Sequence, residues 1–173
     1  MPMRRLCLIL LCGLVAVPAA LAAARAPGDG VLELSKVNGT VVVTGTRGTL
    51  WGQIDKGRVV VTDPVAGDGQ VLVSGWETKK PGVLDGTVTY SGADLRFRVT
   101  GGRYRLLLKG SGIDLTAVGV GTAQLSGDLL ADTPGNYALD SGKWIAVPYF
   151  PASRLVMFGV QPLPTGSPSS STP

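Results

Sequence analysis

From Val31 to Gly159 the chain is a succession of short runs of β-branched and apolar residues, each ended by Gly, Pro, Asn-Gly or Asp-Gly. No ten-residue window has apolar residues at helical spacing, and the runs have the length and composition of strands. Turn residues that recur so closely are typical of antiparallel sandwiches and barrels. The sequence therefore predicts an all-β domain, either an antiparallel sandwich or a flattened barrel.

The runs predict about 12 or 13 short strands. In chain order they cover residues 31–34, 40–44, 49–54, 58–62, 70–76, 87–90, 94–100, 103–109, 113–118, 122–126, 136–139, 143–147 and 154–158. Residues 38–58 also align with residues 85–103 through identical Gly, Thr, Val, Leu and Arg residues, which suggests an internal duplication near 45 residues.

One hairpin is predicted in register, with Gly101-Gly102 as a two-residue turn. This turn places Val99 opposite Tyr104, and Leu95 and Phe97 opposite the other apolar residues of the second strand, all on the core side. Arg98 then faces Arg105 on the other side. Lys56-Gly57 is predicted to form a similar turn.

The first residues have the order of a secretory signal peptide. Arg4 and Arg5 precede an apolar run over residues 6–17, and small residues follow. These small residues favour cleavage after Ala22 or Ala24. The alternative is an uncleaved anchor, because the apolar stretch approaches the length that spans a bilayer. We therefore expect a secreted or extracytoplasmic protein of the cell envelope.

The sequence divides into a signal peptide (1–24), an all-β domain (25–160) and a Pro/Ser/Thr-rich tail (161–173) that is predicted to be disordered. Both cysteines, Cys7 and Cys12, lie in the signal peptide, so packing must stabilise the domain. Cleavage removes two arginines and leaves 14 basic against 12 acidic residues. This near balance does not favour nucleic acid as a partner, and a membrane is expected only for export unless the signal is retained.

The residues available for catalysis are few. The chain has no His, and the cleaved chain has no Cys, so neither a Ser-His pair, a Cys-His pair nor the usual zinc site is possible. Half of the Asp residues adjoin Gly or Pro, where turn formation explains them. Asp63 and Asp68 flank a loop that would suit calcium, but their spacing matches no EF-hand, and we interpret them as turn residues. We expect no enzyme, no metal and no cofactor.

The cationic residues of two consecutive predicted strands give the clearest surface signal. In the predicted hairpin all of them leave the sheet on one face, where Arg can grip carboxylate, sulfate or phosphate with two hydrogen bonds. The alternative is a solvated face that keeps the sheet soluble. The candidate anion-binding residues are Arg96, Arg98, Arg103, Arg105 and Lys109.

Aromatic residues give the second surface signal. Trp51 lies on the non-core face by strand parity, Trp76 opens a polar loop, and Tyr149 and Phe150 lie between two prolines. Exposed rings would stack on sugars or insert into a partner, whereas burial by a second sheet is the alternative. The Phe150-Pro151 bond is a candidate for the cis isomer.

A glycine-rich motif carries the one resemblance to a known group. The run YSGADLRFRV at residues 90–99, followed by GGRYR at 101–105 and GSGIDL at 110–115, resembles a group of exported bacterial β-proteins of unknown function. The resemblance covers about residues 31–160. It implies an exported, bacterial, all-β protein, and the group has no established activity or site residues to carry over.

These observations predict a non-catalytic β-domain that binds an acidic envelope component through its Arg-rich face. The component would be a wall polymer, an anionic glycan or a lipid surface. The alternative is a structural or protein-interaction module at the cell surface that uses sheet edges and the surfaces at Trp51, Trp76 and Phe150 to bind a surface protein. A glycan-active enzyme, with a carboxylate pair assembled from distant loops, ranks below both.

Overall fold

The computed structural model describes residues 25–63, 65, 67–82, 84 and 86–160. Every regular element in these residues is a strand, which confirms the predicted all-β class. The predicted signal peptide and the predicted tail lie outside the described residues. Within the described part of the chain, no helix is present that is long and apolar enough to cross a membrane.

The described residues form eight strands rather than 12 or 13, because three of the strands are long and bent. They are β1 Gly30–Thr62, β2 Gly69–Ser74, β3 Thr78–Pro81, β4 Thr87–Gly101, β5 Tyr104–Gly127, β6 Asn136–Leu139, β7 Ile145–Ala146 and β8 Arg154–Phe158. β1 alone contains four of the predicted strands, which are its straight stretches. β3 was not predicted.

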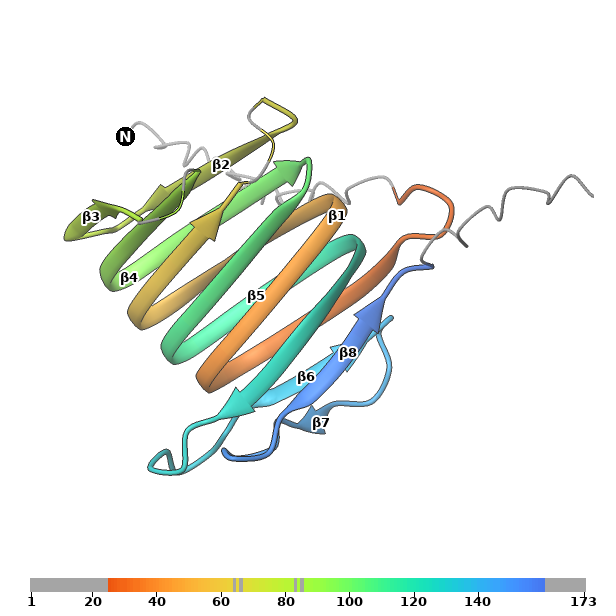
Figure 1. The fold of residues 1–173 in the computed structure, drawn as a ribbon. Coiled ribbons are helices and arrows are strands. Elements are labelled where there is room, and N and C mark those ends of the chain that lie inside the picture. The colour runs from red at the N-terminus through yellow and green to blue at the C-terminus, as the bar shows by residue number, and fades with distance from the viewer. Residues whose placement is uncertain (1–24, 64, 66, 83, 85, 161–173) are drawn as a thin grey trace, which may run out of the picture.

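The strands form one antiparallel sheet in the order β2-β4-β1-β5-β8, with β3 paired to β4 and β6 paired to β1 and β7. The sheet is not closed, since β2 and β8 lie at its two ends (Figure 1). β1, β4 and β5 each fold over, so that successive stretches of one strand lie in two facing layers (Figure 1). Layer A contains β3, residues 87–93, 56–62, 104–110, 39–45 and 121–127, and β8. Layer B contains β2, residues 95–101, 47–54, 113–119 and 30–35, and β6 with β7.

A row of glycines marks the crease between the layers on one side. Cα partners across successive strands in this row are Gly92, Gly57, Gly110, Gly39 and Gly127. A Cβ at Gly57 or Gly110 would overlap the carbonyl oxygen of the neighbouring strand, and one at Gly39 would overlap that of Ser126. Only residues without a side chain allow the strands to approach in this way. The crease therefore explains part of the high glycine content.

The core lies between the two layers. Inward-facing residues such as Leu50 and Phe97 in layer B and Val43 and Leu106 in layer A are fully or almost fully buried in one apolar cluster. The residues next to them in the strands, such as Thr44 and Arg98, face outward, as strand alternation requires. Among the described residues no polar or charged residue is buried. The layers are therefore held together by apolar packing, and polar chemistry is confined to the outer faces and corners.

The predicted hairpin at Gly101-Gly102 is wrong. Leu95 and Val99 pair with Ile54 and Leu50 of β1, whereas Tyr104 pairs with Gly45. The glycines, with φ of 72° and 69°, carry the chain from layer B into layer A instead of turning it back within one layer. The predicted turn at Lys56-Gly57 fails for the same reason, because β1 continues there across the crease. A hairpin and a crossing between the layers bury the alternating apolar residues equally well. The apolar pattern therefore did not distinguish these two connections.

Candidate functional site

The predicted stripe of cationic residues is divided between the two layers. Arg96 and Arg98 lie in layer B, where their Cα partners in β1 are Gln53 and Trp51. Arg105 and Lys109 lie in layer A. Arg103 precedes β5 at the corner, and its N–H donates to the Asp68 carboxylate at 3.0 Å. The prediction that all five leave the sheet on one face is therefore corrected.

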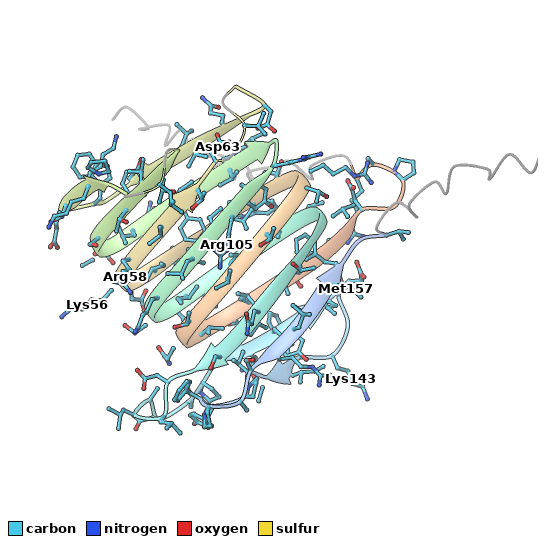
Figure 2. All side chains as sticks on the ribbon, in the orientation of Figure 1. Lys56, Arg58, Asp63, Arg105, Lys143 and Met157 are labelled. Atoms are coloured by element: carbon cyan, nitrogen blue, oxygen red, sulfur yellow. The ribbon has the colours of Figure 1, made fainter. Side chains whose placement is uncertain are left out.

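The outer face of layer A carries Arg105 and Lys109 together with Arg58, which was not predicted as a site residue. Lys109 has Arg58 and Thr40 as Cα partners in the adjacent strands, and Figure 2 shows Arg58 and Arg105 on the front of this layer. No outward position in the described strands of layer A is Asp or Glu. The pairing of residues 56–62 with 104–110, which the hairpin prediction missed, is what brings Arg58 into this face.

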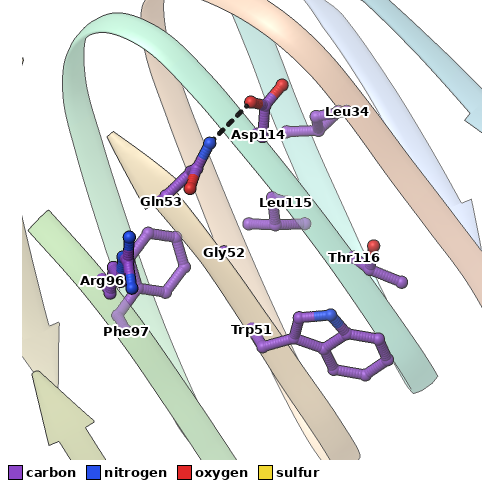
Figure 3. A pocket seen from close by; sticks show the side chains of 9 residues that line it. All are labelled: Leu34, Trp51, Gly52, Gln53, Arg96, Phe97, Asp114, Leu115 and Thr116. Atoms are coloured by element: carbon purple, nitrogen blue, oxygen red, sulfur yellow. Dashed lines mark hydrogen bonds between the residues drawn. The ribbon is translucent and has the colours of Figure 1, made fainter. Parts of the chain in front are cut away.

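The outer face of layer B contains a hollow beside Trp51. Its volume is roughly 410 Å³, and it is formed by adjacent stretches of β1, β4 and β5 (Figure 3). Trp51 keeps 39% of its surface exposed and has Arg98 and Thr116 as Cα partners. The residues that line the hollow are Leu34, Trp51, Gly52, Gln53, Arg96, Phe97, Asp114, Leu115 and Thr116.

The backbone of Gly52 forms part of the floor of this hollow. It lies between Trp51 and Gln53 in β1, with Phe97 and Leu115 as Cα partners. A side chain at this inward position would overlap the Asp114 carbonyl oxygen and approach the Phe97 ring to 2.8 Å. The side chains of Trp51 and Gln53 point outward on either side of Gly52 and flank its backbone (Figure 3). Strand parity predicts Trp51 on an outer face, but no pattern in the sequence indicates the hollow.

The hollow presents both donors and acceptors. Gln53 Nε2 donates to Asp114 Oδ2 at 3.2 Å (Figure 3), and the Lys36 N–H donates to Asp114 Oδ1 at 2.8 Å. Burial of the Asp114 carboxyl opposes its ionisation, but these hydrogen bonds and the Lys36 ammonium outweigh burial and lower its pKa below the ordinary value of 3.8. Asp114 is therefore a carboxylate acceptor at neutral pH. In the described part of the chain, Arg96 and Arg98 have no carboxylate within ion-pair distance.

The other predicted aromatic contacts lie elsewhere. Trp76 is 46% exposed and packs at 6.4 Å, ring to ring, against Tyr90, over which Lys79 Nζ lies at 5.5 Å from the ring centroid. Tyr149 and Phe150 are exposed in the loop before β8. The Phe150-Pro151 bond is cis. The predicted aromatic set thus forms three separate surfaces, and only Trp51 joins cationic candidates.

The carboxylates that we considered for calcium serve their own loops. Asp63 Oδ1 accepts from the Val65 N–H at 3.1 Å, and Asp68 accepts from Arg103 as described above. No cluster of three metal-ligating side chains occurs in the ranges that the structure describes. Comparison of the whole chain with protein-family models, curated proteins and solved structures finds no match.

Proposed function

We propose that this chain is a non-catalytic, exported β-domain of the cell envelope that binds an acidic glycan on the outer face of layer B. The observation that carries the proposal is the pairing of exposed Trp51 with Arg98 in adjacent strands, beside the hollow. The proposal that the chain is exported is supported by residues 1–24, which have the sequence pattern of a signal peptide.

Each of these side chains makes a different interaction with such a ligand. The apolar surface of the Trp51 ring packs against the C–H face of a sugar. Arg96 and Arg98, free of ion pairs in the described residues, hydrogen-bond the carboxylate or sulfate of an acidic sugar. Gln53 and the ionised Asp114 bind hydroxyl groups. An aromatic platform with charged groups beside it favours an acidic sugar over an inorganic anion.

We expect a glycan to bind layer B rather than layer A, although layer A is more cationic. In layer A the outward residues beside Arg105 and Lys109 are Arg58, threonines and aliphatic residues, with no ring on which a sugar stacks. A purely electrostatic surface binds polyanions with strong salt dependence. Layer A therefore provides a matched control. Two of the predicted anion-binding residues, Arg105 and Lys109, lie in layer A, as many as in layer B.

The test is titration of the purified chain with polygalacturonate at low and high salt. Arg96→Glu with Arg98→Glu is expected to weaken binding about tenfold or more, because two ion pairs worth roughly 0.2–1 kcal/mol each become repulsions. Trp51→Ala is expected to weaken the binding that survives high salt. Arg105→Glu with Lys109→Glu changes the net charge equally and is expected to have a much smaller effect, as is Trp76→Ala.

Two results would overturn the proposal. One is equal loss of binding in the two double variants, which would show that net charge alone attracts the polymer. The other is unchanged binding in the folded Trp51→Ala and Arg96→Glu/Arg98→Glu variants. Concentration-dependent assembly without polymer binding would instead favour the structural or protein-interaction module, and turnover of the polymer would favour the enzyme.

A further inference from the structure

A trough of roughly 1110 Å³ runs along the glycine crease, away from the Trp51 hollow. Its floor includes the backbone of Gly110, Gly39 and Gly127, which follow one another across three adjacent strands of layer A. Because glycine at these positions lets the strands approach closely, the floor is formed by backbone. The trough extends from Lys56 to the loop after β5, which is about three strand spacings, or roughly 14 Å.

One end of the trough is cationic. Lys56 and Lys109 line it, both side chains lie at exposed residues, and neither ammonium has an ion-pair partner in the described residues. Thr40 and Ser111 also line it and add hydroxyl groups. This end can therefore hold an acid group, with charge and with hydrogen bonds.

The other end is an apolar wall. Leu129, Leu130 and Phe150 line it with exposed fractions of 59%, 93% and 61%. Large apolar side chains exposed together in this way mark a binding surface more often than single exposed residues do. Figure 1 shows the loop after β5 beside the loop that precedes β8.

Hydrogen bonds hold this wall in place. The Phe150 N–H donates to the Gly127 carbonyl and the Gly127 N–H to the Pro148 carbonyl, both at 2.8 Å. Asn38 Nδ2 donates to the Thr133 carbonyl at 2.9 Å, which ties the loop to β1. The trough is therefore preformed, as ligand sites usually are.

The carboxylates of the trough determine the orientation of a ligand. Asp128 and Asp132 also line it, but both belong to the loop that carries Leu129 and Leu130. Asp128 Oδ1 already accepts from the Leu130 N–H at 3.0 Å. An acid group is repelled from the loop end and attracted to the lysine end, so an elongated ligand with one acid group is oriented by charge.

We propose that the trough binds an amphiphilic anion, an aliphatic chain that carries one acid group. The acid binds Lys56 and Lys109, and the chain lies over the glycine floor against Leu129, Leu130 and Phe150. The ligand is either a free amphiphile or a lipid of an anionic bilayer, because both have this chemistry. The site is separate from the proposed glycan face and does not depend on it.

Calorimetric titration of the full chain with laurate, below its micelle concentration, tests the proposal. Lys56→Ala with Lys109→Ala is expected to weaken binding at least tenfold, and so is Leu129→Ser with Leu130→Ser. The matched controls are Lys79→Ala with Lys80→Ala on β3, and Leu155→Ser with Met157→Ser on β8, where the two side chains are similarly exposed at 67% and 65%. Both controls are expected to bind laurate as the unchanged chain does. Thermal unfolding checks that each variant is folded.

A second arm distinguishes the two sources. Flotation with phosphatidylglycerol vesicles, compared with phosphatidylcholine vesicles, reports binding to a bilayer. Binding of laurate alone supports a free amphiphile, and vesicle binding that both test variants lose supports a bilayer lipid. Binding of neither probe overturns the proposal, as does laurate binding that the lysine variant retains in full or that the uncharged dodecyl maltoside matches.

Discussion

Lys36 and Asp114 are joined twice at the corner where β1 passes from layer B to layer A. Lys36 Nζ lies 3.3 Å from Asp114 Oδ2, and the Lys36 N–H donates to Asp114 Oδ1 at 2.8 Å. Lys36 has a φ of 51°, in the left-handed region that residues other than glycine rarely adopt. The Asp114 carboxylate thus holds a bend of β1 that the backbone alone disfavours, and the same carboxylate lines the proposed glycan hollow.

Asp114→Asn is expected to lower the free energy of unfolding at pH 7 by about 1–2 kcal/mol, because it removes charge-assisted hydrogen bonds. The folded pKa of Asp114 is depressed below 3.8, so its contribution is present above that value and is lost as the pH falls through the folded pKa. The difference between the unchanged chain and Asp114→Asn is therefore expected to shrink at about pH 2.5. Urea unfolding at the two pH values measures it.

Asp132→Asn is the control, since the Asp132 side chain is exposed and accepts no hydrogen bond in the described residues. It is expected to change stability little at either pH. A stability difference for Asp114→Asn that is the same at both pH values would show that the carboxylate charge does not stabilise the corner.

Gly110→Ala is expected to destabilise the fold by more than about 3 kcal/mol, because its Cβ would overlap the Lys56 carbonyl oxygen across the crease. Gly67→Ala is the control: Gly67 also has a positive φ, of 86°, but nothing lies within 4 Å of its Cβ position. It is expected to cost about 1 kcal/mol, the penalty for the backbone conformation alone. Similar unfolding midpoints for the two variants would contradict the role of the crease in close strand approach.

The strands could be predicted more reliably than their connections. Alternation identified the inward residues correctly, and Leu95, Phe97, Tyr104 and Leu106 are all buried. Alternation does not say which layer a strand joins, since each layer has an inner and an outer face. A glycine pair such as Gly101-Gly102 permits both a tight turn and a crossing between layers, so local turn chemistry did not decide between them.

The sequence predicted which residues of the candidate site lie on outer faces, but not that these residues lie next to one another. Parity placed Trp51, Arg96 and Arg98 on outer faces, and each is exposed. Their juxtaposition depends on β1 lying between β4 and β5, a pairing between segments more than 40 residues apart that no local pattern reports. Likewise, residues 40–44 and 87–91 both lie in layer A, and residues 49–54 and 95–100 both lie in layer B, as the predicted duplication requires. The duplication itself stays a prediction.

Arg47→Ala is expected to lower the free energy of unfolding by about 1–3 kcal/mol. Arg47 Nη2 lies 3.0 Å from Asp29 Oδ1, and the Asp29 side chain is only 9% exposed. Nη2 also donates to the Pro27 carbonyl at 3.1 Å. Loss of the guanidinium leaves a nearly buried carboxylate without its counter-charge. Urea unfolding measures the change.

Arg25→Ala is the control for Arg47→Ala. Arg25 also pairs with an aspartate, Asp140, at 3.4 Å, but both side chains are about half exposed or more. Exposed pairs contribute little, so a change within about 0.5 kcal/mol is expected. Equal effects of the two variants would mean that burial of Asp29 does not set the strength of its ion pair.

Ionisation of Tyr104 is expected to destabilise the fold at high pH. Its ring is buried against Gly45, and burial raises its pKa from 10.0 to about 12. The unfolded chain then loses this proton first as the pH rises, so the contribution of Tyr104 to stability is complete below pH 10 and is lost as the pH approaches 12. The unchanged chain is expected to lose roughly 1–3 kcal/mol more than Tyr104→Phe between pH 9 and about pH 11.5. Urea unfolding measures this difference, and phenolate absorbance is expected to show that the variant lacks the tyrosine that titrates last.

Tyr149→Phe, at an exposed position, is the control. If Tyr104→Phe and Tyr149→Phe lose stability equally over this range, the buried hydroxyl does not cause the destabilisation.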